Sequence, residues 1–327
     1  MKTFNSLKKL AVIIIAMIAF TSCSNDDDNS TPTPDPLNIV ETAQSVGDLS
    51  ILVDAVIQAG LVDALTASGD KTVLAPTNAA FTAFLAAKGF NALSEVPNDV
   101  LTQILLNHVI GGANIPSSAL IGNTGYTNTL ADGPNETKLS LYYNGTAGVV
   151  FNGSAKVETP DVSTSNGIVH IIDKVIDLPT IATFATTNDA LSTLVSALVY
   201  ADTGSPTVPY IATVSDATAG PFTVFAPTND AFRSLLTELE VSALTDIATA
   251  TVDAVLLNHI VNANVQSSGL TSGEVPTLGG PITADATAFT LTDGNDRLSN
   301  IVTSLVDIQA TNGVVHVIDR VLLPASE

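Results

Sequence analysis

Four histidines are the side chains of this sequence best suited to both metal binding and proton transfer near neutral pH: His108, His170, His259 and His316. All four lie in blocks of sequence that occur twice. His108 follows Leu105 by three residues and Ile104 by four, and His259 stands in the same relation to apolar neighbours. Side chains at these spacings share one face of a helix. We therefore expect His108 and His259 to be buried and hydrogen-bonded, with a structural role rather than a metal-binding one.

No other arrangement of residues predicts catalysis or a bound cofactor. The chain has no HExxH zinc motif, no Gly-x-Ser-x-Gly nucleophile turn and no glycine-rich phosphate loop after a strand. Asp293-Gly-Asn-Asp296 offers carboxylates to Ca²⁺, but it lacks a complete ligand loop and has no counterpart in the first copy. A solvated hairpin tip is expected there instead. We expect no enzymatic activity, no cofactor and no metal.

The elements that must position the histidines follow from a duplication. Thr72-Val-Leu-Ala-Pro-Thr-Asn-Ala-Ala-Phe81 returns as Thr223-Val-Phe-Ala-Pro-Thr-Asn-Asp-Ala-Phe232. Each block begins like a buried strand, is interrupted by a proline that cannot donate to a sheet, and continues into a pair of residues suited to starting a helix. The block therefore predicts a strand-to-helix corner in each copy, with the helix starting at Thr77 and Asn78 or at Thr228 and Asn229.

A second repeated block closes each copy. It reads Asn166-Gly-Ile-Val-His-Ile-Ile-Asp-Lys-Val-Ile176 and then Asn312-Gly-Val-Val-His-Val-Ile-Asp-Arg-Val-Leu322. Apolar side chains at consecutive positions are typical of a central strand that is buried on both faces. His170 and His316 lie inside these predicted strands, and we assign them a structural role as well.

Periodicity predicts an amphipathic helix at the start of each copy, over 49–57 and 191–199, and short strands with hairpin turns over 120–162 and 270–308. The fold class is therefore α+β, with one domain at 37–178 and a second at 180–324. The second copy carries nine extra residues near Thr203–Gly220, since the offset between copies grows from 142 to 151. We predict an enlarged surface loop that contributes a binding surface through Tyr210.

Residues 1–22 have the basic start and short apolar run of a signal peptide. Phe20-Thr-Ser-Cys23 resembles the lipobox of bacterial lipoproteins, so we expect Cys23, the single cysteine, to be acylated; the alternative is a secreted protein with a free thiol. Residues 23–36 are acidic and rich in proline, which predicts an extended tether. The expected location is the outer membrane with display on the cell surface, and a periplasm-facing anchor is the alternative.

The charge of the chain excludes some partners. The formal net charge is −21 at pH 7, from 32 acidic and 11 basic residues. Binding to nucleic acid, or to an anionic membrane surface, depends on Lys and Arg that neutralise phosphate. We therefore expect no nucleic-acid partner and no membrane contact except through a lipid anchor.

The repeated blocks resemble the signatures of the fasciclin-like, or FAS1, family, in order and in both copies. The resemblance implies two compact wedges of mixed β-sheet flanked by helices, and a secreted or surface-displayed module associated with adhesion. It also places Asp161-Val162 and Asp307-Ile308 where an Asp-Ile pair resembles an integrin-contacting site of animal members. The alternative is that each Asp caps the turn before Asn166 or Asn312 while the apolar residue packs inward. Asn107 and Asn258 replace a tyrosine of the family pattern, so the binding role of that tyrosine is not carried over.

These observations predict a lipid-anchored adhesion or binding protein that recognises a matrix protein, a cell-surface protein or a polysaccharide. One alternative is a glycan-binding accessory of a nutrient-uptake system, for which sugar rings would stack on exposed aromatic side chains. The chain has no Trp, so that reading depends on its five tyrosines, Tyr126, Tyr142, Tyr143, Tyr200 and Tyr210. A structural spacer of the envelope is a third possibility.

Overall fold

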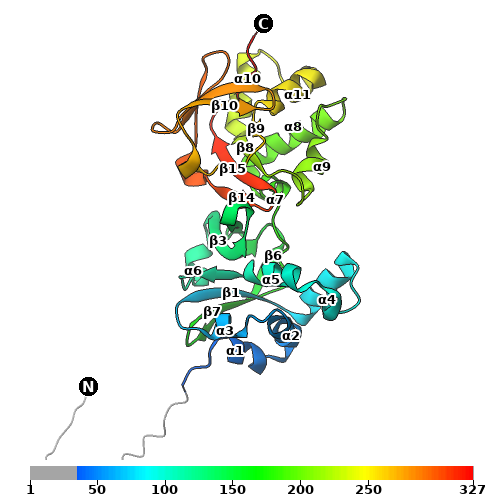
Figure 1. Ribbon diagram of the computed structural model, residues 1–327, viewed down its shortest axis with the longest axis vertical. Coiled ribbons are helices and arrows are strands. Elements are labelled where there is room, and N and C mark those ends of the chain that lie inside the picture. Colours follow the sequence, from blue (N-terminus) through cyan, green and yellow to red (C-terminus); the bar gives the residue numbers. More distant parts are fainter. Residues whose placement is uncertain (1–34, 327) are drawn as a thin grey trace, which may run out of the picture. The chain divides into compact units, whose positions relative to one another are not determined.

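The computed structural model describes residues 35–326 (Figure 1). The predicted signal peptide 1–22, Cys23 and nearly all of the predicted tether 23–36 lie outside these residues. The prediction of an α+β fold is confirmed. The helices are α1 Ile39–Ser45, α2 Ser50–Gln58, α3 Val62–Thr66, α4 Asn78–Lys88, α5 Asn98–Leu106, α6 Ser117–Leu120, α7 Ile181–Thr187, α8 Ser192–Asp202, α9 Tyr210–Ser215, α10 Asn229–Glu238 and α11 Thr249–Leu257.

The first copy is built on a seven-stranded sheet in the order β2-β1-β7-β6-β5-β4-β3. Strands β1 and β7 pair in parallel and each has a neighbour on both sides, as expected for the closing block, and the other pairs are antiparallel. The bounds are β1 Lys71–Pro76, β2 Val109–Gly111, β3 Thr124–Asp132, β4 Lys138–Asn144, β5 Val150–Phe151, β6 Ala155–Thr164 and β7 Gly167–Ile172.

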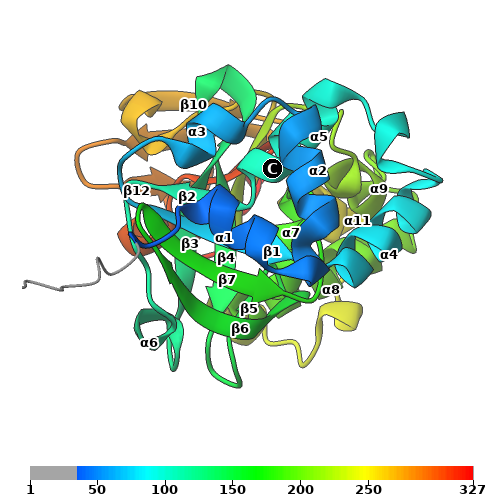
Figure 2. The same ribbon diagram turned by 90° about the horizontal axis from the view of Figure 1, so that it is seen from below.

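Helices α1, α2, α4 and α5 cover one side of β1 and β7 (Figure 2). Their apolar faces and the inward side chains of the two strands form one core, with Phe81 and Leu101 each 1% exposed. A second, smaller core lies where β4, β5 and β7 meet, around Phe151 and Leu141. The helical core fixes the two central strands, which carry the repeated polar side chains described below.

The second copy repeats this plan but divides the sheet in two. The orders are β14-β15-β8-β9, with β8 and β15 parallel, and β10-β11-β12-β13. Where the first copy has the continuous strand β6, the second has two short strands, β13 and β14, with a 3-10 turn, Thr303–Leu305, between them. The bounds are β8 Phe222–Pro227, β9 Ile260–Val261, β10 Gly273–Thr277, β11 Gly280–Asp285, β12 Thr290–Thr292, β13 Leu298–Asn300, β14 Ile308–Ala310 and β15 Gly313–Ile318.

The strand-to-helix corners form in both copies. Thr77 is the N-cap of α4 and accepts a hydrogen bond from Ala80 N, and Thr228 does the same for Ala231 N at the start of α10. Asn78 reaches sideways instead: its Oδ1 accepts from Ile51 N at 2.9 Å and its Nδ2 donates to Gly47 O at 3.1 Å. The corner therefore caps one helix and fixes the start of α2.

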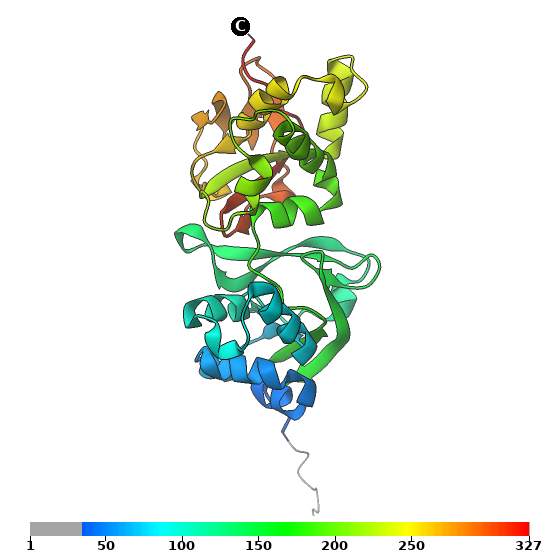
Figure 3. The same ribbon diagram turned by 90° about the vertical axis from the view of Figure 1, so that its right-hand side faces the viewer.

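The first and second copies meet within the compact part of the chain that runs from residue 36 onward. Strand β4 lies beside β14 where the two copies meet (Figures 1 and 3). There Gln309 N donates to Ser140 Oγ at 2.9 Å. The Tyr126 ring packs edge-on against Phe184 of α7, with centroids 5.6 Å apart, and Asn188 Nδ2 donates to its hydroxyl. The contact between the two copies is therefore both apolar and hydrogen-bonded.

Candidate functional site

Three side chains, two of them from the repeated blocks, converge on one short segment of the first copy, residues 113–117, which we call the clamped loop. Thr72 Oγ1, on β1, donates to Ala113 O at 2.8 Å and accepts from Ile115 N at 2.9 Å. His170 Nε2, on the neighbouring strand β7, donates to Ile115 O at 2.9 Å. The main-chain groups of Ala113 and Ile115 are thus hydrogen-bonded by side chains of two adjacent strands, and not by the main chain of the sheet.

Asp161 completes the clamp from β6. Its Oδ1 accepts from Ser117 N at 2.8 Å, and its Oδ2 accepts from Ser117 Oγ at 2.5 Å. These hydrogen bonds hold the pKa of the Asp161 carboxyl below its usual value. Its backbone is left-handed, with φ of 59°, which a non-glycine residue adopts at a cost. The carboxylate therefore caps the start of α6, 44 residues earlier in the chain, and not the turn at Asn166.

The second copy repeats every contact on residues 263–267, its own clamped loop. Thr223 Oγ1 donates to Ala263 O at 2.6 Å, and His316 Nε2 donates to Val265 O at 2.9 Å. Asp307, with φ of 55°, accepts from Ser267 N and Oγ. Burial lowers the pKa of His316, so its ring is neutral at pH 7. The same set of hydrogen bonds is therefore present in both copies, although the surrounding sequences differ widely.

Ser117, His170 and Asp161 are residue types of a catalytic triad, but their hydrogen bonds do not support that chemistry. A triad needs the serine hydroxyl hydrogen-bonded to the histidine, which takes its proton. Here Ser117 Oγ donates to Asp161, while His170 Nδ1 accepts from Asp161 N at 3.2 Å and His170 Nε2 is bound to Ile115 O. With both ring nitrogens committed to the main chain, His170 has no free atom with which to act as a general base.

A pocket lies beside each clamped loop. In the first copy it has a volume of about 260 Å³ and is lined by residues of β1, β2, α6 and the β3–β5 hairpins. In the second copy it has about 240 Å³ and involves the matching elements around Thr223, Val261 and Gly269. The side chains that form the clamps, Thr72, Thr223 and His316, also line these pockets. The clamp therefore shapes a concave surface in each copy.

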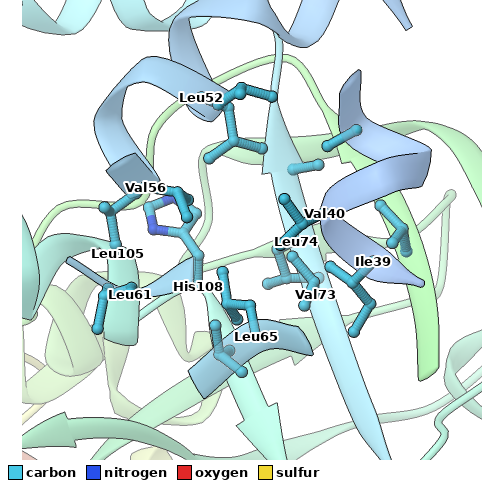
Figure 4. A pocket seen from close by; sticks show the side chains of 15 residues that line it. Ile39, Val40, Leu52, Val56, Leu61, Leu65, Val73, Leu74, Leu105 and His108 are labelled. Carbon is cyan, nitrogen blue, oxygen red and sulfur yellow. The ribbon is translucent and has the colours of Figure 1, made fainter. Parts of the chain in front are cut away.

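His108 and His259 belong to a different setting, the core. His108 is 2% exposed and borders a small apolar cavity of about 30 Å³ between α1, α2, α3 and the central strands (Figure 4). Its Nδ1 donates to Ile104 O at 2.7 Å and its Nε2 accepts from Ile176 N at 2.8 Å. His259 makes the same pair of bonds, to Val255 O and from Leu322 N. Burial lowers the pKa of both to about 4, so both are neutral at pH 7.

Two of the predicted binding residues are buried, and a third is partly buried. Tyr210 is 0% exposed, and its hydroxyl donates to Asp253 Oδ1 at 2.7 Å, so the prediction of a binding surface through its side chain is wrong. The segment predicted as a surface loop contains α9, the counterpart of α3, whose start Tyr210 anchors in the core. Ile308 is 1% exposed, and Val162 packs against the helical core. Val162 is only partly buried, and Asp161 and Asp307 retain partly exposed carboxylates.

The turn at Asp293 also differs from expectation. Asp293 is 5% exposed rather than solvated, because its carboxylate accepts from the main chain of Asn295 and Leu323 and from Arg297 Nη1. These contacts use both oxygens within the protein. No group of three or more His, Cys, Asp or Glu side chains suited to a metal ion is found among residues 35–326.

Sequence reasoning missed the serines and threonines of the clamp. The signal was present: Ala113-Asn-Ile-Pro-Ser117 returns as Ala263-Asn-Val-Gln-Ser267, a third repeated block with polar residues at fixed positions. It also passed over Asn166 and Asn312, whose Oδ1 atoms accept from the first residues of α1 and α7, Ile39 N and Ile181 N. Repeated polar residues in a duplicated chain identify hydrogen bonds between distant segments.

Comparison with known proteins gives a consistent result. Residues 47–179 and 189–324 each match the Fasciclin domain. Protein sll1483 of Synechocystis is 37% identical over 145 residues, 44% of this chain and 73% of that protein. The transforming growth factor-beta-induced protein ig-h3 of Oryctolagus cuniculus is 28% identical over 313 residues, 91% of this chain and 41% of ig-h3. Human periostin is 27% identical over 302 residues, 89% of this chain and 32% of periostin. The chain thus spans less than half the length of the latter two.

A solved structure shares the fold of the whole pair. It is a FAS1 domain pair from the insect cell adhesion molecule fasciclin I, with a TM-score of 0.50 over 85% of this chain and 97% of that chain. The sequence identity is 18%, so this similarity concerns the fold alone. Across residues 35–326, no helix has both the length and the apolar composition needed to cross a bilayer.

Proposed function

The chain belongs to the Fasciclin domain family, with two domains in tandem, and from this we propose that it is an exported adhesion or binding protein held at the cell envelope by a lipid anchor. The single structural observation that carries the binding part of the proposal is the duplicated clamp. Thr72, His170 and Asp161, and their second-copy counterparts, rigidly position a loop beside a pocket. Rigid scaffolds that present loops are typical of binding modules.

The hydrogen bonding of the histidines supports binding rather than catalysis. A general acid or base needs a ring nitrogen within reach of a substrate. In His108, His170, His259 and His316 both nitrogens face main-chain partners. The proposed partner is a surface or matrix protein, or a polysaccharide, and the proposed domains are 37–178 and 180–324.

The burial of the tyrosines weighs against the alternative of a glycan-capture accessory. Sugar-binding surfaces present exposed aromatic rings. Tyr142 and Tyr210 are buried, while Tyr126, Tyr143 and Tyr200 are half-buried. The hydroxyls of Tyr126 and Tyr200 are held by Asn188 and by Ile247 O. Protein recognition is therefore the reading we adopt.

Membrane attachment through Cys23 is tested by replacing the residue. Cys23→Ser should move the chain from the membrane fraction to the soluble fraction and abolish incorporation of labelled palmitate. Ser22→Ala, a change beside the anchor, serves as the control and should remain in the membrane fraction. Continued sedimentation of Cys23→Ser with outer membranes would contradict the anchor.

Binding itself is tested by surface plasmon resonance of the purified chain over immobilised matrix proteins, polysaccharides and isolated envelope. The proposal predicts saturable binding to at least one protein surface. A folded chain that binds only the polysaccharides would favour the glycan alternative, and one that binds none would leave a structural spacer as the better account.

A further inference from the structure

The two pockets beside the clamped loops recur at the same place in both domains. Their volumes are about 260 and 240 Å³, and their linings differ: Ala119 is replaced by Gly269, and Phe151 lines the first pocket where Phe225 lines the second, while Leu120 and Leu270 match. An open pocket leaves the apolar side chains of its lining without packing partners, which costs stability. A packing defect would not be expected to survive divergence in two copies, so the recurrence indicates a use.

The linings show what kind of group fits. Ile110, Leu120 and Phe151 in the first domain, and Phe225, Val261 and Leu270 in the second, are apolar. Each pocket also has hydroxyl groups. Thr72 and Thr223 use theirs for the clamped loops, and Thr127, Tyr143 and Thr271 add others to the linings. Neither lining contains Lys or Arg. An apolar group is therefore preferred over a strongly polar or anionic one.

The charge around the pockets indicates which residues should flank the apolar group of a partner. The Asp161 side chain is 42% exposed and caps the turn that forms one wall of the first pocket. In the second domain, exposed Glu274 lines the pocket and Asp307 is 34% exposed. The chain as a whole carries a net charge of −21. A partner with a positive charge next to its apolar group is electrostatically complementary to both sites.

We propose that each pocket takes one large apolar side chain of a partner protein, presented next to a Lys or Arg. This rests on the proposed binding function and names the chemistry of its partner. Drug-sized ligands occupy pockets of about 300–1,000 Å³, so these smaller pockets suit a single side chain. Two such sites on one chain allow a partner with repeated anchors to bind more tightly than either site alone would permit.

The clamp residues act as positioning residues in this account. Asp161 holds α6 by two bonds to Ser117, and α6 supplies Ala119 and Leu120 to the pocket wall. In the second domain Asp307 holds the 3-10 turn Ser267–Gly269 in the same way. The pocket is thus preformed, which lowers the entropic cost of binding.

The test fills the pockets from their rims. Ala119 and Gly269 are exposed, and a Cβ added at Gly269 meets no atom within 4 Å, so Ala119→Phe with Gly269→Phe places rings at the pockets with little strain. Ser118→Phe with Ser268→Phe, one residue earlier on each turn, is the matched control. The probe is a labelled Gly-Ser peptide with Phe between two Lys, measured by fluorescence anisotropy on the full chain. Parallel peptides carry Ser for Phe, or Glu for Lys.

The proposal predicts binding of the Lys-Phe-Lys peptide that weakens about tenfold or more with Ser in place of Phe, with Glu in place of Lys, and in the pocket-filled chain. The Ser118→Phe, Ser268→Phe control should bind like wild type.

No binding by wild type, or equal binding by the pocket-filled chain, overturns the inference. If the pocket-filled chain still binds the protein surface found by plasmon resonance, the proposed function stands and recognition lies elsewhere. Concentration-dependent dimerisation abolished by the filled pockets would instead assign the pockets to a second copy of this chain.

Discussion

Acid should destabilise this protein in a window set by His108 and His259. Each is neutral and buried in the folded chain, with a pKa lowered from 6.5 to about 4. Between these values the unfolded chain binds more protons than the folded one, so stability rises with pH and is lost as pH falls below 6.5. The difference of 2.5 between the pKa in the unfolded and folded states corresponds to about 3 kcal/mol of unfolding free energy per histidine. This stabilisation is fully lost near pH 4.

Urea unfolding followed by circular dichroism at intervals from pH 7 to pH 4 measures this effect. Within the window, the free energy of unfolding should fall by up to about 1.4 kcal/mol per pH unit for each histidine. His108→Gln with His259→Gln removes both titrating groups and should flatten this slope, although the variant is less stable at pH 7. His316, and carboxylates such as Asp161 whose pKa is lowered in the folded chain, also contribute to the acid slope, but they do so in both the wild type and the double variant. The difference between the two slopes therefore reports His108 and His259. An unchanged slope in the double variant would refute the assignment of the two histidines.

Two further predictions concern the clamp and the core. Asp161→Asn removes the charge from two hydrogen bonds while keeping a residue that tolerates a left-handed backbone. We expect a loss of about 1–3 kcal/mol of unfolding free energy and faster amide exchange at Ser117, with Asp54→Asn on the exposed side of α2 as the control. Unchanged exchange at Ser117 would show that the loop holds without the carboxylate. Val73→Ile extends a side chain at the 30 Å³ cavity of Figure 4. The added methyl group should raise the free energy of unfolding by at most about 0.7 kcal/mol, which a higher urea midpoint would show. A lowered midpoint would mean that the cavity cannot take a methyl group.

Local rules explain which parts of the fold were predictable. The corner at Thr77 depends on a proline and a cap within a few residues of each other, so the sequence contains the whole interaction. The closing strand is buried on both faces, and its uninterrupted run of apolar residues predicts this burial directly. The family resemblance is likewise confirmed by matches to both copies.

Interactions between distant segments account for what was missed. Asp161 was expected to cap a turn five residues ahead, but its partner Ser117 lies 44 residues behind it, where no local pattern points. Tyr210 sits among Thr, Pro and Ser residues typical of a loop, yet its ring fills the core beside α8. Neither outcome follows from periodicity, because each depends on how helices and strands pack after they form.

The most direct test of the central claim, that this chain is an adhesion module at the cell envelope, is retention of cells under flow on a surface coated with the bound partner. Cells that carry the wild-type chain should be retained, and those with Cys23→Ser should be washed away although they secrete a folded chain that still binds the partner. The account further predicts reduced retention for Ala119→Phe with Gly269→Phe and wild-type retention for the Ser118→Phe, Ser268→Phe control. Equal retention of cells with and without the chain, on every surface that the purified protein binds, would contradict the claim.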